Sequence, residues 1–233
     1  MKYSISDYYY ACYNNLIDMC IDRGYTTSDN SNLEDLKLER QDFDAKYEKH
    51  ISGKYTALDI LPPKIIDERG TPVYVTFIEH TREGTTFIKN ILTGVYNQLK
   101  DDFDLSKEDY RVEILQRVHC IVIHRSESKT GSQYHHNFEL FHTNKFFLNV
   151  TKHEIVPQHI MMTDKERKAI FETKNMGLAT CPKILSDDPV NLYYNGQAGN
   201  VYKIIREAKG VYFRVVVNGK PSPFSNQFKR LIK

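Results

Sequence analysis

The sequence predicts a chain of two domains, a mixed α/β domain followed by a small α+β domain. Two stretches with helical spacing of apolar residues open the chain, and apolar strands alternate with a third helical stretch up to about residue 150. After that point a short helix precedes two strands joined by a tight turn. We therefore expect domains over residues 1–148 and 149–217, with residues 218–233 as an extension.

A first helix is expected over residues 6–23. Tyrosine, cysteine, leucine and methionine recur there at spacings of three and four, which places them on one side of a helix. Ser6 or Asp7 can cap its first turn, and Gly24 can end it in the left-handed conformation. The chain should therefore open on an amphipathic helix.

A second helix is expected over residues 33–50, after the polar loop at residues 26–32. Leu36, Phe43 and Tyr47 should face inward, because the many charged residues of this stretch occupy the other side. Both predicted helices precede the sheet of the first domain.

The sheet of the first domain is expected within residues 73–150. Alternation over residues 73–77 predicts a strand, and helical spacing over residues 85–100 predicts a helix, with four inward residues, Phe87, Ile91, Val95 and Leu99. Two further strands are predicted over residues 111–124 and 138–150. The first contains the almost uninterrupted apolar run VHCIVIH, which is typical of a buried central strand. Residues 51–72 should be irregular.

The second domain should contain a small sheet and one short helix. Residues 153–162 are predicted to be extended. Thr163 and Glu166 form a capping-box pattern, which predicts a helix starting there and ending near residue 173. Two strands joined by a tight turn are expected over residues 201–206 and 211–217.

The charge of the chain is nearly balanced. The formal net charge is +2 and 27% of residues are charged, so no overall basic field indicates nucleic-acid binding. The end of the chain differs, because six cations and no acidic residue follow Glu207. Such a tail is either a solvated extension or a contact for an acidic partner. No apolar run of about 18 residues is present, and we expect no membrane contact.

Metal ligation is not expected. The four cysteines lack zinc-site spacing and should be reduced core residues of an intracellular protein: Cys12, Cys20, Cys120 and Cys181. His135 and His136 are followed by His142, and His119 and His124 lie in the preceding predicted strand. Neighbouring strand residues point to opposite faces, and no carboxylate stands at a ligand spacing beside them. We therefore expect neither a metal nor a cofactor.

Catalytic patterns are also missing. A restriction-type nuclease places an Asp and an Asp/Glu-x-Lys pair at strand ends, where they hold a metal. The two Asp-x-Lys occurrences, residues 35–37 and 44–46, fall on the charged helical stretch instead. Neither a phosphate-binding loop nor a nucleophile elbow is found. The sequence therefore predicts no catalytic residue.

Four motifs in the last third of the chain occur in an order that resembles one known family. Residues 149–159 read NVTKHEIVPQH, and residues 182–184 (PKI) precede residues 188–190 (DPV). GNVYKIIR follows at residues 199–206, and YFRV at residues 212–215. This series resembles the assembly domain of the fifth subunit shared by eukaryotic RNA polymerases I, II and III, and of its small counterpart in archaeal RNA polymerase.

The resemblance implies a fold and a function. It implies an N-terminal jaw domain with a nuclease-like, catalytically inert sheet, and a small C-terminal assembly domain. The chain would then be a non-catalytic subunit of a multisubunit DNA-directed RNA polymerase. Its partners would be the largest polymerase subunit, the small omega-like subunit and downstream duplex DNA. It would act in the nucleus if it is cellular, or in the virion or infected-cell cytoplasm if it is viral.

The resemblance also implies candidate contact residues. Those expected at the partner interface are His153, Glu154, Val156, Pro157, His159, Asp188, Pro189, Lys203 and Arg206. Pro157 keeps its segment extended, and Glu154 between two histidines can make charge-assisted bonds, either internally or across an interface. In the jaw domain, residues suited to phosphate contact near DNA are Lys129, Thr130 and Ser132.

Two other functions stay open at this stage. The first is a restriction-fold nuclease with a fused binding module, which requires paired carboxylates in the sheet of the first domain. The second is a free-standing DNA-binding protein, which requires salt-sensitive affinity of the chain alone. Residues of the HEIVPQH stretch can equally serve only to hold the small domain together.

Overall fold

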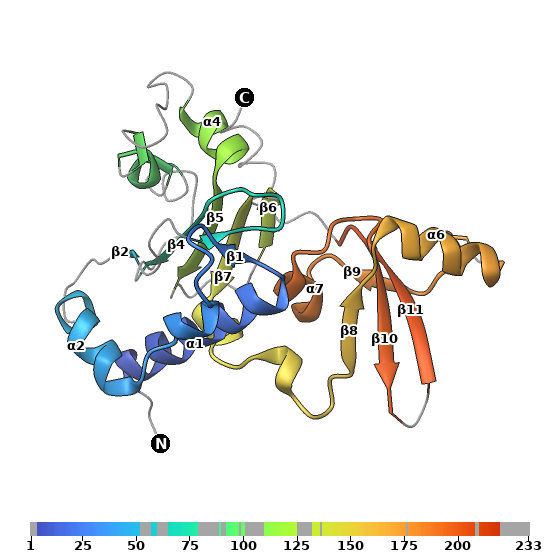
Figure 1. Ribbon diagram of the computed structural model, residues 1–233, viewed down its shortest axis with the longest axis horizontal. Helices are drawn as coiled ribbons and strands as arrows, with labels where there is room; N and C mark the ends of the chain where they lie inside the picture. The colour runs from blue at the N-terminus through green and yellow to red at the C-terminus, as the bar shows by residue number, and fades with distance from the viewer. Residues whose placement is uncertain are drawn as a thin grey trace. The chain divides into compact units, whose positions relative to one another are not determined.

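The computed structural model describes most of the chain, which falls into two compact units that divide between Leu148 and Asn149 (Figure 1). Each unit is described by itself. The described residues are 4–51, 57–59, 65–78, 89, 92–97, 99–100, 110–124, 132–135, 137–175, 177–207 and 210–219. Within these residues, no helix is long and apolar enough to cross a membrane.

The first helix of unit 1, α1 (Ile5–Asp22), starts earlier than predicted. Its N-cap is Ser4 rather than Ser6 or Asp7, and Asp7 instead completes the capping box by bonding back to Ser4. The hydroxyl of Ser6 bonds Asp44 at 2.6 Å. Gly24 has φ 72°, the left-handed conformation predicted for the residue that ends this helix.

The predicted second helix is two elements, the 3-10 turn η1 (Leu33–Leu36) and α2 (Arg40–Ile51). The chain is extended at Lys37, whose ammonium bridges Asp18 on α1 and Glu34 on η1. Because of this break, Leu33 rather than Leu36 is buried, whereas Phe43 and Tyr47 are buried as predicted.

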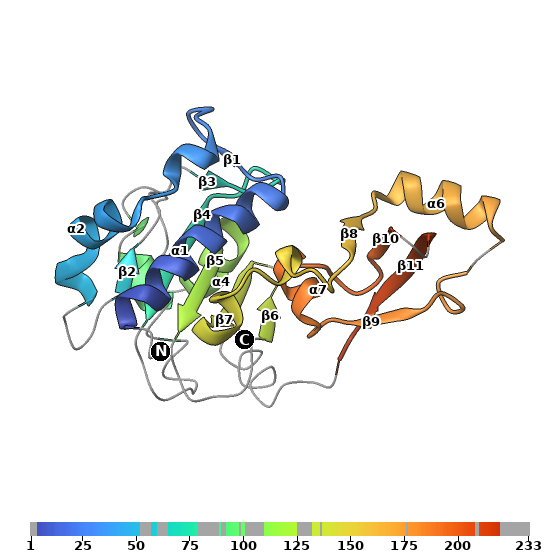
Figure 2. The same cartoon turned by 90° about the horizontal axis from the view of Figure 1, so that it is seen from below.

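The sheet of unit 1 has five strands in the order β2-β4-β5-β7-β6 (Figure 2). They are β2 (Ala57–Asp59), β4 (Val73–Ile78), β5 (His119–His124), β6 (Ser132–His135) and β7 (Phe138–His142). The central strands β4, β5 and β7 run parallel, and every residue of β5 is buried. The buried central strand predicted from VHCIVIH is confirmed. A separate short ladder joins β1 (Thr26–Thr27) to β3 (Ile65–Ile66). Of these two strands, β3 lies inside the stretch predicted to be irregular.

The prediction of one strand over residues 111–124 is wrong in its first half, which forms α4 (Tyr110–Arg117). Ile114 and Val118 are four residues apart, and both pack in one core cluster with Leu92, Val95 and Leu99. This is helical spacing, hidden by the apolar strand that follows. Residues 92–97 are helical as predicted, whereas Phe87 and Ile91 lie outside the described residues.

The predicted strand over residues 138–150 is also shorter than expected. After β7, Nδ1 of His142 accepts a bond from the backbone of Asn144 and caps the short helix α5 (Thr143–Phe146). Asn149 then caps the 3-10 turn η2 (Val150–Lys152). Side-chain caps therefore end the strand well before residue 150.

Unit 2 is built on a four-stranded sheet in the order β8-β10-β11-β9. Its strands are β8 (Gln158–Met161), β9 (Lys183–Leu185), β10 (Val201–Arg206) and β11 (Gly210–Val217), and the last two are an antiparallel pair as predicted. Helix α6 (Asp164–Thr173) starts with the predicted Thr163–Glu166 capping box. Helix α7 (Pro189–Tyr194) follows the N-cap residue Asp188.

Each face of this sheet carries its own core. On the α6 face, Ile170 and Phe171 pack against Val201, Phe213 and Val215. On the other face, the α7 face, a second cluster holds Ile184, Tyr202, Ile204 and Val216, with Tyr194 of α7 packed on it. The two helices thus cover opposite sides of β10 and β11 (Figure 2).

All four cysteines are buried and free, as the sequence predicted for core residues. Burial raises the pKa of the Cys12, Cys20 and Cys120 thiols to about 12. These thiols are therefore protonated and unreactive at neutral pH.

Candidate partner interface

Strand β8 lies at the edge of the unit 2 sheet, and in the described part of the chain it pairs only with β10. The backbone N–H of Met162 donates to Val201 O, directly opposite. Since hydrogen-bonded and non-hydrogen-bonded pairs alternate in an antiparallel ladder, Ile160 and Gln158 also bond β10. The peptide groups of His159 and Met161 therefore point to the open edge, where another strand can pair with them.

The stretch predicted to be extended, residues 153–162, is extended in β8, whereas its first half forms a compact turn. The N–H of Val156 donates to His153 O at 2.8 Å, and Nδ1 of His153 accepts from the N–H of Ile155 at 3.3 Å. The turn raises Ile155 into solvent, with 83% of its surface exposed. Glu154 is exposed too, and in the described part of the chain His153 and His159 bond backbone groups instead of its carboxylate. An apolar side chain at the tip of a turn is available for contact with a partner.

His159 carries its proton on Nδ1, because this nitrogen lies 2.7 Å from the carbonyl of Pro157 and must donate to it. Burial lowers the pKa of His159, an effect opposed by the Pro157 bond and Asp188 and reinforced by Arg214 and Arg206. Its ring stands edge-on to Tyr202, with centroids 5.9 Å apart. At neutral pH His159 is therefore a neutral, oriented ring at the rim of the α7 face.

Asp188 and Pro189 start helix α7. The Asp188 carboxylate accepts from Val190 N at 2.9 Å, and Pro189 occupies the first helical position, where its missing N–H costs nothing. In this structure, the pair therefore has a local role in the fold of unit 2.

Asn191, the fully buried polar residue that ties α7 to the sheet, was not predicted from the sequence. Its amide donates to Ser186 O and Gly196 O, and its oxygen accepts from the Tyr202 hydroxyl at 3.0 Å. The cap signal of Asp188-Pro189 was visible in the sequence, but nothing there marks Asn191 as the partner of a tyrosine eleven residues away.

Lys203 and Arg206 lie on opposite faces of β10. Lys203 stands opposite Ile160 and Phe213 on the α6 face, within electrostatic reach of Glu166. Arg206 lies on the α7 face, where His159 also lies. The structure therefore brings His159, Asp188 and Arg206 into one neighbourhood and leaves Lys203 out of it.

The candidate DNA contacts are only partly described. Lys129 and Thr130 lie outside the described residues. Ser132 begins β6, the edge strand of the unit 1 sheet, where its backbone pairs with Leu140.

Unit 1 contains a buried ionic cluster in which carboxylates from distant parts of the sequence lie beside His119, although none stands at a ligand spacing in the sequence. The guanidinium of Arg23 makes two bonds to Glu139, at 2.7 and 2.9 Å, and Nε2 of His119 lies 2.7 Å from Glu139 Oε1. The other ring nitrogen of His119 lies 3.4 Å from Asp67. Sequence spacing could not reveal this cluster, because its members come from four separate segments of the chain.

The carboxylates of the cluster lie against cationic or hydrogen-bonding partners. Burial alone would raise the pKa of Glu139, but Arg23 and His119 lower it to about 2. Burial alone would lower the pKa of His119, but its bonds to Asp67 and Glu139 raise it. The pKa of Asp67 is also lowered, despite burial, by bonds from His119, Arg69 and the backbone. Both carboxylates are therefore ionised and already bonded to their partners. We therefore assign the cluster a role in the fold.

Within the described ranges, no group of three or more His, Cys, Asp or Glu side chains is placed to hold a metal ion. His124 and His142, at the ends of neighbouring strands, meet edge-on with ring centroids 5.5 Å apart. Burial, and then His142, lower the pKa of His124 to about 4, so it is neutral at pH 7.

Comparison with known proteins shows that residues 148–216 match the family model described as RNA polymerase Rpb5, C-terminal domain. The chain is similar to an Arabidopsis thaliana protein named DNA-directed RNA polymerases IV and V subunit 5B, with 28% identity covering 84% of this chain and 82% of the relative. It is also similar to the Caenorhabditis briggsae DNA-directed RNA polymerases I, II, and III subunit RPABC1, with 27% identity over 87% of this chain and 92% of that protein. A Dictyostelium discoideum subunit of the same name is 34% identical over 71 residues, or 30% of this chain and 36% of the relative.

Proposed function

Because residues 148–216 match the family model of the RNA polymerase Rpb5 C-terminal domain, we propose that the chain is a non-catalytic subunit of a multisubunit DNA-directed RNA polymerase. The family match carries this proposal. Similarity to the Arabidopsis and Caenorhabditis subunits continues through most of unit 1, which supports a role for the whole chain rather than for one borrowed domain. The named relatives are eukaryotic, which favours the nucleus; a viral chain would act in the virion or infected-cell cytoplasm.

Unit 2 is the proposed docking module for the largest subunit, with the small omega-like subunit nearby. A partner strand adds to the open edge of β8 and pairs with the peptide groups of His159 and Met161. The exposed Ile155 at the neighbouring turn supplies an apolar contact. The open edge and the exposed apolar tip support this mode of docking.

Unit 1 is the proposed jaw, lying toward downstream DNA, with Lys129, Thr130 and Ser132 near the phosphates. The near-neutral charge of the chain supports weak DNA contact that depends on the assembled polymerase. An activity of its own is disfavoured by the buried cluster, where Arg23, His119 and Arg69 occupy the carboxylates of Glu139 and Asp67.

Co-expression with the largest subunit of the polymerase from the same source tests the proposal. We expect the full chain to co-purify with that subunit at physiological salt. Failure to associate with any polymerase subunit, or magnesium-dependent DNA cleavage by the purified chain, would contradict it.

A further inference from the structure

Two arginines, a tyrosine and a histidine share the α7 face of the unit 2 sheet, and we name this set the arginine face: His159, Arg206, Tyr212 and Arg214. The strand register fixes their positions. Ile204 stands opposite both His159 and Tyr212, Arg214 opposite Tyr202, and Arg206 opposite Gly210. Residues opposite each other in a ladder share a face, as do residues two apart on one strand.

The arginine face is exposed and positively charged. Arg206 and Arg214 are exposed, and Tyr212 keeps 46% of its surface in solvent. The guanidinium of Arg206 lies 5.6 Å from the centre of the Tyr212 ring. Among the described residues, neither arginine makes an ion pair, whereas Arg40, Arg69 and Arg167 each do. Both guanidinium groups are thus available to bind the carboxylates of a partner.

We propose that the arginine face binds an extended acidic segment of another polymerase subunit. This inference rests on the proposed function and adds the chemistry of the partner to it. Arg206 stands beside Gly210, and Arg214 lies four residues further along β11, so their backbones are separated by ~13 Å along the strand. An extended segment repeats this spacing at every fourth residue. Carboxylates four residues apart thus meet both guanidinium groups, with the ring of Tyr212 between them.

A protein segment fits this face better than a nucleic acid. Asp188 acts on His159 at one border of the face, and the exposed Glu207 directly follows Arg206. A continuous phosphate backbone would meet these carboxylates, whereas a peptide can place neutral residues beside them. The neutral His159 ring can likewise donate from one nitrogen only, and that nitrogen already bonds Pro157.

Binding of a labelled synthetic peptide to the purified full chain tests the inference. The probe carries glutamate at every fourth position in a threonine-rich, extended background, and the control peptide carries glutamine at those positions. We expect the glutamate peptide to bind more tightly than its glutamine control. The double change Arg206→Gln with Arg214→Gln should weaken binding about tenfold at low salt.

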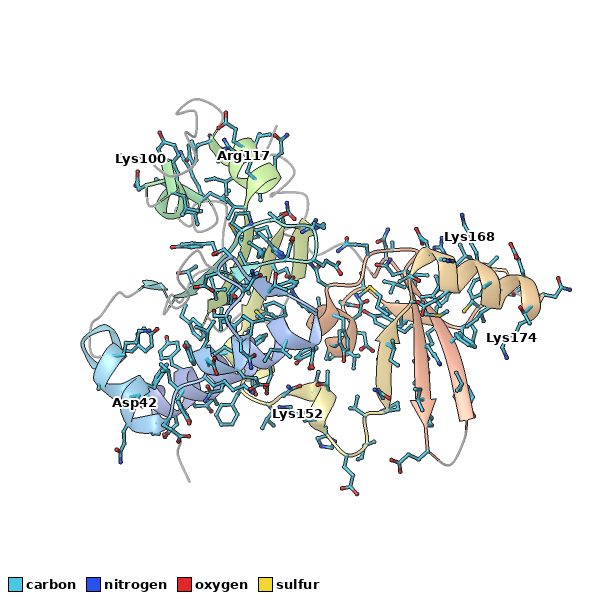
Figure 3. All side chains as sticks on the ribbon, in the orientation of Figure 1. Asp42, Lys100, Arg117, Lys152, Lys168 and Lys174 are labelled. Carbon is cyan, nitrogen blue, oxygen red and sulfur yellow. The ribbon has the colours of Figure 1, made fainter. Side chains whose placement is uncertain are left out.

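Lys168→Gln is the matched control, because Lys168 is an exposed cation of the same unit on α6, which packs on the opposite face (Figure 3). It should leave peptide affinity unchanged. Equal losses from Lys168→Gln and from the arginine changes would overturn the inference, as would equal affinity for both peptides. If a single-stranded oligonucleotide of matched charge binds more tightly than the glutamate peptide, the ligand of this face is a nucleic acid and the inference is wrong. If the peptide binds through the arginines but the chain fails to assemble with polymerase subunits, the proposed function is wrong. Binding of an acidic ligand to the arginine face would still be supported.

Discussion

Nε2 of His119 donates to Oε1 of Glu139 over 2.7 Å, with the two side chains only 0% and 4% exposed. The same carboxylate oxygen accepts from Arg23 at 2.7 Å. This contact joins the end of α1 to two neighbouring parallel strands of the unit 1 sheet. Removing one member of such a group leaves a buried charge without its partner. This costs more free energy than the intact pair contributes to stability.

Glu139→Gln should therefore lower the free energy of unfolding of unit 1 by about 3–5 kcal/mol. Urea unfolding followed by circular dichroism measures this loss. Asp164→Asn serves as the control, because Asp164 is exposed and pairs at the surface with Arg167 in unit 2. It should change stability little. A similar small effect of both changes would show that the buried cluster contributes no net stability.

The same cluster predicts a loss of stability in acid. The pKa of Glu139 is lowered from 4.5 to about 2 in the folded chain, because Arg23 and His119 overcome the effect of burial. The stabilisation from this group is therefore complete above pH 4.5 and disappears as pH falls toward 2. Unfolding measured across this range should show a steeper decline for the parent chain than for Glu139→Gln. Parallel declines would exclude Glu139 as the group responsible.

The stabilisation from His119 has the opposite dependence on pH, because it is lost as the pH rises. Its bonds to Asp67 and Glu139 raise its folded pKa above 6.5 despite burial, so its stabilisation is complete below pH 6.5 and is lost as pH rises through the raised value. His119→Gln should be less stable than the parent chain at pH 6 and should lack this alkaline decline. NMR titration of the imidazole provides the direct measurement. An imidazole that titrates below 6.5 would contradict the assignment.

The sequence predicted elements best where one local signal decided the structure. The Thr163–Glu166 cap and the buried strand β5 were found in this way. The prediction from sequence was wrong where two signals overlapped. At α4, residues with helical spacing are followed directly by an apolar strand. The cluster around Glu139 could not be predicted, because pairing of Arg23 with Glu139 depends on strand order rather than on spacing. In unit 2, the motifs pointed to β8 and Asp188, and strand alternation alone separates Lys203 from Arg206. Only strand register places His159 on the same face as Arg206.

Gly196 should be the glycine of unit 2 that least tolerates a side chain. A Cβ added there would lie 2.2 Å from Asn191 Oδ1 and 2.4 Å from the Tyr202 hydroxyl, so it would break the buried bond between them. Gly196→Ala should destabilise unit 2 by about 1–3 kcal/mol. Gly177→Ala is the control, since its nearest neighbour would be Thr180 at 3.8 Å. Thermal unfolding of both variants gives the comparison, and equal midpoints would contradict the crowding at Gly196.

The open edge of β8 predicts a variant that folds but does not dock. The N–H of His159 points away from β10, so His159→Pro removes a donor from the partner side and leaves the ladder to β10 bonded. Co-purification with the largest polymerase subunit should fall about tenfold or more, because a proline there blocks pairing with an added strand. Circular dichroism should report little change in the folded content of the free chain.

Ile160→Pro provides the contrast, because the N–H of Ile160 bonds β10 opposite Lys203. This change should destabilise unit 2 itself and reduce docking through unfolding. If His159→Pro co-purifies as well as the parent chain, the partner does not pair with this edge, and the turn carrying Ile155 becomes the remaining proposed contact. If His159→Pro unfolds like Ile160→Pro, the alternation of bonded pairs assigned to β8 is wrong.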